Sequence, residues 1–177
     1  MGAKAKAAIL EANQCLTRIT TALNNTMQAF QGMVAQKKGK KDTVVQLAKY
    51  AQKKYPGVMD LTPHVATDPI LQEIQNGIDK CREKIAGFRR DSQAQLLLLD
   101  QYVAEGKKAL EKLDDLIIAK AKQQKEAKGL KKVMAKLKTK SLGDLRDTKN
   151  ALDKTFETVN REALGIRMYF EKVNKQS

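Results

Sequence analysis

The number and spacing of the lysine residues in this sequence indicate one chemistry in particular, the binding of anions. Nine lysines and one acidic residue, Glu126, fall within residues 120–140, and four more lysines surround Gly39. Positive charges gathered this closely repel one another and attract an anionic partner. The predicted anion-binding or lipid-binding residues are Lys37, Lys38, Lys40, Lys41, Lys120, Lys122, Lys125, Lys128, Lys131, Lys132, Lys136, Lys138 and Lys140. The alternative is that 120–140 forms only a solvated tip between two helices.

Residues that could perform catalysis or bind a metal are few and scattered. His64 is the single histidine, and the two cysteines, Cys15 and Cys81, are expected to be reduced thiols. Transition-metal sites combine several such ligands. The sequence also contains no phosphate-binding loop, dinucleotide fingerprint or nucleophile elbow. We therefore predict a protein that is not an enzyme, with no metal, no other cofactor and no small-molecule substrate.

The overall charge balance favours diffuse electrostatic attraction over sequence-specific recognition. The chain carries 34 Lys and Arg residues against 20 Asp and Glu residues, a formal net charge of +14. Of the basic residues, 27 are lysines and 7 are arginines. Lysine is a well-hydrated point charge, whereas arginine is the residue that reads bases and phosphates with two parallel hydrogen bonds.

The element that must position much of this charge is a very long helix predicted over residues 69–128. Asp68 and Pro69 form a typical helix start, and apolar residues then recur at helical spacing as far as the lysine-rich segment. Ser92 weakens the apolar ladder just after Gly87, so the pattern fits either one helix or two collinear helices.

Two further long helices are predicted over residues 3–36 and 141–174, and a short helix over 43–54. The first is expected to end at Gly39, because glycine and lysine are common at helix C-termini. Ser141 and Asp144 approximate a capping box that would start the last helix. We predict an all-α fold, an elongated antiparallel bundle that forms a single domain over 1–177.

The direction of the linker over residues 42–68 decides whether the two lysine clusters lie together. If the linker crosses back along the bundle, the first and third helices are parallel and the clusters share one end. If the linker only turns, those helices are antiparallel and the clusters lie apart. Both arrangements are within reach of the chain, since 14 extended residues span about 46 Å.

The predicted function is that of a non-enzymatic helical scaffold or interaction module whose lysine-rich segment docks on an anionic surface. A protein partner or self-association through the helical faces, and an anionic membrane surface, are the favoured partners. Sequence-independent nucleic-acid binding is the alternative, and it is less favoured because aromatic residues and arginines are not interleaved with the lysines. No apolar run approaches the roughly 18 residues of a membrane span. We expect a cytoplasmic protein, with peripheral membrane association as a further option.

Overall fold

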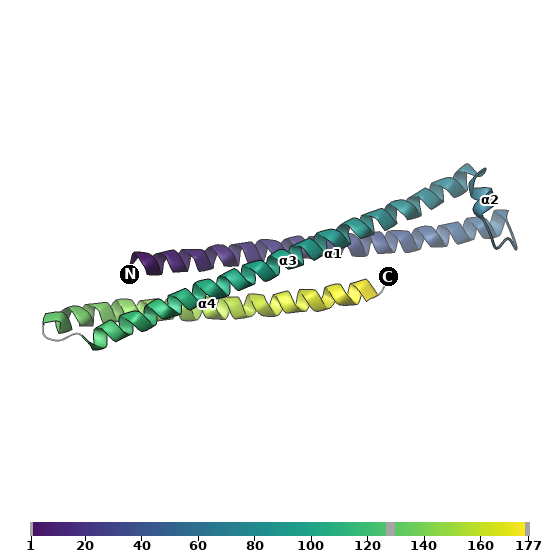
Figure 1. Ribbon diagram of the computed structural model, residues 1–177. Helices are drawn as coiled ribbons and strands as arrows, with labels where there is room; N and C mark the ends of the chain where they lie inside the picture. The colour runs from purple at the N-terminus through teal and green to yellow at the C-terminus, as the bar shows by residue number, and fades with distance from the viewer. Residues whose placement is uncertain (1, 127–129, 176–177) are drawn as a thin grey trace. The chain divides into compact units, whose positions relative to one another are not determined.

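The protein is described by a computed structural model that covers residues 2–126 and 130–175, with side chains described for 2–126 and 141–175. Within these ranges nearly every residue is helical and no strand is present. The helices are α1 (Ala3–Lys54), α2 (Thr62–Val65), α3 (Pro69–Lys125) and α4 (Leu130–Lys175), as Figure 1 shows. The predicted all-α class with three long helices is confirmed for this part of the chain.

Helix α1 runs without interruption for 52 residues, so the predicted end at Gly39 is wrong. The short helix predicted over 43–54 is the last part of α1. A glycine inside a helix costs about 1 kcal/mol relative to alanine. The helix continues here alongside α3, where a Cβ atom on Gly39 would make an ordinary contact of 3.8 Å with the sulfur of Cys81.

Helix α3 is a single helix of 57 residues, which decides between the two predicted alternatives. Ser92 is fully buried, and its hydroxyl donates a hydrogen bond of 2.8 Å to the Phe88 carbonyl one turn earlier. The polar group is thus satisfied without a break in the helix. The apolar ladder predicted for this helix has one member at every seventh residue, and all of them are buried: Leu71, Ile78, Ile85, Ser92, Leu99, Gly106 and Leu113.

Helix α4 begins at Leu130, so the predicted start at Ser141 is wrong. Ser141 and Asp144 lie inside the helix instead of capping it. A serine cap is a local preference of about 1 kcal/mol. The apolar periodicity overrides it, because Leu130, Val133, Met134 and Leu137 already recur at helical spacing before Ser141 in the sequence.

The buried face of α1 is made largely of small residues. Its seam alternates steps of three and four through residues that are all buried: Ala5, Ala8, Ala12, Cys15, Ile19, Ala22, Thr26, Ala29 and Met33. Ile9 and Leu16, beside this seam, are only half-buried.

The chain forms two compact units, and α1, α3 and α4 each contribute residues to both. Unit 1 comprises Met1–Asn24 and Gln95–Met168. In unit 1, Glu11 on α1 pairs with Lys112 on α3 at 3.6 Å, and the exposed Arg18 pairs with Glu105 at 3.8 Å. Later residues of α1 thus meet earlier residues of α3, so the two helices are antiparallel.

Helix α4 completes the core of unit 1. Lys149, which is half-buried among the apolar residues of α4, pairs with Asp153 at 2.8 Å and with Asp114 of α3 at 3.7 Å. The hydrogen bond from Lys149 to Asp153 raises the pKa of Lys149, so its ammonium group stays charged beside the core. The ring of Phe156 lies so close to Gly106 that a Cβ atom there would be 2.1 Å from a ring carbon.

Unit 2 comprises Asn25–Ala94 and Tyr169–Ser177, and its main elements are the second half of α1 and the first half of α3. These are also antiparallel, since Thr43 lies opposite Gly77 and Gly39 lies opposite Cys81. Of the two predicted linker arrangements, the chain therefore adopts the simple turn. The last turns of α4 pack against this pair and bury Phe170 and Val173.

The turn between α1 and α3 is held by the buried carboxylate of Asp68, which caps α3 as predicted. One oxygen accepts a hydrogen bond of 3.0 Å from the Ile70 amide. The other accepts hydrogen bonds from the hydroxyls of Tyr50 (2.9 Å) and Tyr55 (2.7 Å) and from the ammonium of Lys54 (3.1 Å). The Tyr55 hydroxyl above all holds the pKa of Asp68 well below its usual value of 3.8.

The remaining residues of the turn have local structural roles. Gly57 has a φ of 77°, a conformation that few other residues adopt readily, and it lies in the turn that follows the end of α1 at Lys54. The ring of His64, in α2, stacks on that of Tyr55 with the centroids 4.1 Å apart.

Candidate anion-binding groove

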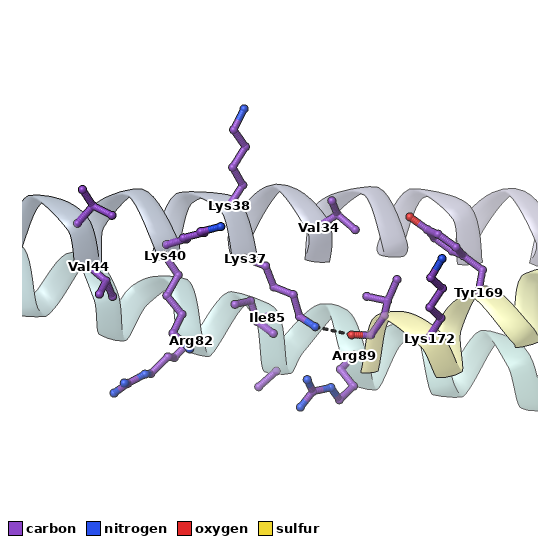
Figure 2. Close-up of a pocket in the computed structure, with 14 residues that line it drawn as sticks. Val34, Lys37, Lys38, Lys40, Val44, Arg82, Ile85, Arg89, Tyr169 and Lys172 are labelled. Atoms are coloured by element: carbon purple, nitrogen blue, oxygen red, sulfur yellow. Dashed lines mark hydrogen bonds between the residues drawn. The ribbon is translucent and has the colours of Figure 1, made fainter. Parts of the chain in front are cut away.

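Four of the predicted lysines line one groove in unit 2, which we call the basic groove. It lies between α1, α3 and the end of α4 and has a volume of about 1020 Å³. Figure 2 shows it with α3 and the end of α4 beside α1. Its fourteen lining residues are Val34, Lys37, Lys38, Lys40, Lys41, Val44, Val45, Arg82, Ile85, Ala86, Arg89, Tyr169, Lys172 and Val173.

The charge of the basic groove has one sign. Helix α1 supplies four lysines, α3 supplies Arg82 and Arg89, and α4 supplies Lys172, whereas no acidic residue is among the lining residues. Among the described side chains, no carboxylate pairs with Lys38, Lys41 or Lys172. Arg82 has only an exposed pairing with Asp79 at 3.7 Å, a contact of little energetic value.

Helical periodicity explains how these side chains come to face one groove. Lys37 and Lys40 are three residues apart on α1 and half-buried. Arg82 and Arg89 are seven residues apart on α3, on either side of the buried Ile85. In Figure 2, Lys38 extends outward from α1, away from α3, and Arg82 extends outward from α3, away from α1, so these two cations lie on the outer borders of the groove.

Two of the cations also hold the end of α4 in place. The ammonium of Lys37 donates a hydrogen bond of 2.6 Å to the Val173 carbonyl (dashed in Figure 2). Val173 lies in the last turn of α4, where carbonyl groups lack partners within the helix. The guanidinium of Arg89 donates a hydrogen bond of 2.9 Å to the side chain of Asn174.

The cations of the groove are close enough to affect one another. Burial lowers the pKa of Lys37, and the neighbouring charges of Arg89 and Lys40 lower it further. Both effects disfavour the charged form of Lys37. A bound anion would oppose the second effect, so the groove has an electrostatic reason to accept one.

The basic groove also has apolar walls. Ile85 is buried, whereas Val44 and Val45 are exposed to 44% and 47%. Val34 on α1 and Tyr169 on α4 are exposed to a similar degree. A ligand that combines anionic groups with an apolar surface would therefore match the groove better than a simple ion.

Comparison with known proteins does not assign the chain to a family. No protein-family model, no curated protein and no solved structure matches it. In the described part of the chain no helix has the length and apolar character needed to cross a membrane. No cluster of potential metal ligands occurs among those residues either.

The other predicted lysines are not brought to this groove. Lys120, Lys122 and Lys125 belong to unit 1, on the last turns of α3, and Lys120 is half-buried with its ammonium near Gly2. Lys128 lies outside the described residues. The backbone at Lys131, Lys132, Lys136, Lys138 and Lys140 belongs to α4, but the side chains of these five lysines are not among those described.

Sequence reasoning missed Arg82, Arg89 and Lys172 as members of the site. The segment that contains the two arginines has a net charge close to zero, so a sum of charges along the chain hides them. Their spacing of one heptad was a usable signal, since residues seven apart share a helix face. Their approach to Lys37–Lys41 depends on the pairing of α1 with α3, which the sequence left undecided.

Proposed function

We propose that this protein is a non-enzymatic helical binding module that docks on an anionic partner, with the basic groove as its main docking site. The observation that carries this proposal is the convergence of seven cations from three helices around one groove that has no acidic lining residue. Lipid headgroups and acidic proteins are the two partner classes with matching charge.

The lysine-rich segment 120–140 is proposed as a second contact with the same kind of partner. Near an anionic bilayer each exposed lysine contributes about 1 kcal/mol before screening by salt. Lys122 and Lys125 are exposed at the end of α3 and are available for such a contact. Under this proposal the protein is cytoplasmic and reaches membranes only peripherally.

Co-sedimentation with vesicles tests the proposal. Vesicles of phosphatidylserine and phosphatidylcholine, vesicles of phosphatidylcholine alone, and soluble polyglutamate would be compared at about 50 mM and about 500 mM NaCl. We expect binding to at least one anionic probe at low salt and its loss at high salt. Failure to bind every anionic probe at low salt would refute the proposed function.

Charge-reversal variants identify the surface responsible. Lys38→Glu with Lys41→Glu should weaken binding about tenfold or more, because both lysines are exposed and lack acidic partners among the described side chains. Lys80→Glu with Lys84→Glu changes the net charge equally but lies on exposed positions of α3 outside the groove. If both double variants lost the same amount of affinity for the anionic probe, binding would depend on the overall charge of the protein and not on the groove.

Sequence-independent nucleic-acid binding is the second candidate. The observation in its favour is that the groove adds two arginines and the half-exposed ring of Tyr169 to the lysines, a combination that can stack on bases. A mobility shift with single-stranded and duplex DNA at low salt separates the candidates. Tighter binding to single-stranded DNA than to either lipid or polyglutamate, reduced by Tyr169→Ala, would favour nucleic acid.

A further inference from the structure

The end of α4 shows what kind of structural element binds to the surface between α1 and α3 in unit 2. Phe170 of α4 stacks on Phe30 of α1 with the ring centroids 5.3 Å apart, and Tyr169 lies 5.7 Å from the same ring. Lys37 and Arg89 hydrogen-bond to the last turn of α4 from either side. This surface therefore binds a helix already, through an apolar seam bordered by cations.

The basic groove continues that surface beyond α4. It begins beside Tyr169 and Val173 and extends to Val44 and Val45 on α1 and to Arg82 on α3. Its apolar residues lie on the same helices as its cations, with Val44 and Val45 next to the lysines of α1 and Ile85 between Arg82 and Arg89 along α3. A volume of about 1020 Å³ lies at the upper end of small-molecule pockets, enough for several side chains of one helix face.

Shape favours a helix over a bilayer as the occupant. Bilayer-binding surfaces present their apolar side chains outward, so that these enter the membrane while the cations stay at the headgroups. The basic groove is instead a hollow between α1 and α3, in which Ile85 is buried and Lys37 and Lys40 are half-buried. A rod-shaped amphipathic helix can enter such a hollow, as the end of α4 already does beside it, and bring both apolar and charged side chains to these residues.

Resting on the proposed function, we propose that the basic groove binds an acidic amphipathic helix of a protein partner, seated between α1 and α3 in line with the end of α4. Apolar residues of that helix at i, i+3, i+4 and i+7 contact Val44, Val45 and Ile85. Its Glu and Asp residues flank the stripe and pair with Lys38 and Lys41 on one side and with Arg82 on the other.

A pair of synthetic peptides tests this proposal with the full chain. The first is a peptide of about 18 residues, about 27 Å long as a helix, with leucines at i, i+3, i+4 and i+7 and glutamates at most other positions. The second has the same composition in a scrambled order that forms no apolar stripe. Binding is measured by fluorescence anisotropy at about 150 mM NaCl, and peptide helicity by circular dichroism.

We expect the patterned peptide to bind at least about tenfold more tightly than the scrambled peptide and to gain helicity on binding. Val45→Gln should weaken its binding several-fold, and Lys38→Glu with Lys41→Glu about tenfold or more. Lys80→Glu with Lys84→Glu should leave it nearly unchanged. Each variant is checked for unchanged helicity and for a thermal midpoint no lower than that of the wild type, which is expected because all of these side chains are exposed.

Other results overturn the inference in distinguishable ways. Two results would refute an amphipathic helix as the ligand and leave the proposed function intact. One is equal affinity for both peptides, and the other is groove-dependent binding of phosphatidylserine vesicles without binding of the patterned peptide. Failure of both peptides and of all vesicles at low salt would refute both proposals.

Discussion

At the scale of single residues, Asp68 shows how one carboxylate organises a turn. Its two oxygens join the start of α3 to two tyrosines and a lysine at the end of α1. Sequence reasoning identified the cap from the order Asp-Pro. The tyrosine and lysine partners could not be predicted, because they lie 13 to 18 residues away along the chain.

Replacement of Asp68 should lower stability in a pH-dependent way. Because the folded pKa of Asp68 is depressed, its stabilising effect is complete above its usual pKa of 3.8 and is lost as pH falls below that value. Asp68→Asn should therefore lower the thermal midpoint by roughly a few degrees at pH 7, and the gap from wild type should narrow below about pH 4. Thermal unfolding followed by circular dichroism at several pH values measures both effects. Asp91→Asn, at an exposed carboxylate on α3, is the control. If the difference in thermal midpoint between wild type and Asp68→Asn did not narrow at low pH, the stabilising role of the ionised Asp68 carboxylate would be contradicted.

A second residue-scale prediction concerns the contact of Gly106 with Phe156. A Cβ atom at Gly106 would lie 2.1 Å from a buried ring, so Gly106→Ala should destabilise the protein by about 1–3 kcal/mol. Gly87 has nothing within 4 Å of its Cβ position, so Gly87→Ala should stabilise by about 0.5–1 kcal/mol through helix propensity. Urea unfolding of the two variants should give changes of opposite sign, and two changes of the same sign would be inconsistent with this packing.

At the scale of elements, the uninterrupted course of α1 is the main departure from the sequence prediction. Glycine flanked by lysines is typical of a helix end, and only the partner helix shows why it is not one here. For α3 the sequence left open one helix or two collinear helices near Ser92, and the structure shows one continuous helix whose ladder, Ser92 included, is buried. Local signals of about 1 kcal/mol thus give way to packing that extends over many turns.

Gly39→Ala distinguishes a first helix that ends in a cap at Gly39 from the continuous α1 of the structure. In a left-handed cap, alanine would be strained and the protein would lose about 1 kcal/mol. In the continuous helix, the new Cβ atom makes an ordinary contact with Cys81 and the protein should gain about 0.5–1 kcal/mol. Equilibrium unfolding in urea measures the change, and a loss of stability would contradict a continuous α1.

At the scale of the whole molecule, the dominant property is the net charge of +14. A charge this far from zero destabilises the folded state through self-repulsion. Raising NaCl from about 20 mM to about 300 mM should therefore raise the thermal midpoint by roughly a few degrees. Lys38→Glu with Lys41→Glu lowers the formal charge by four, to +10, and should reduce this rise. A midpoint that fell with salt would show that attractive ion pairs, and not repulsion, dominate.

The sequence by itself determined the all-α class, the three long helical segments, the buried ladder of α3 and the excess of lysine, because these follow from residue type and from spacing within one helix, whereas the ends of α1 and α4 did not follow. It also assigned Lys37, Lys38, Lys40 and Lys41 to the candidate site. Only the tertiary structure decided that α1 and α3 are antiparallel and that Arg82, Arg89 and Lys172 join those lysines around one groove. The physical reason is that pairing between helices depends on contacts between residues far apart in the chain, which periodicity within each helix leaves open.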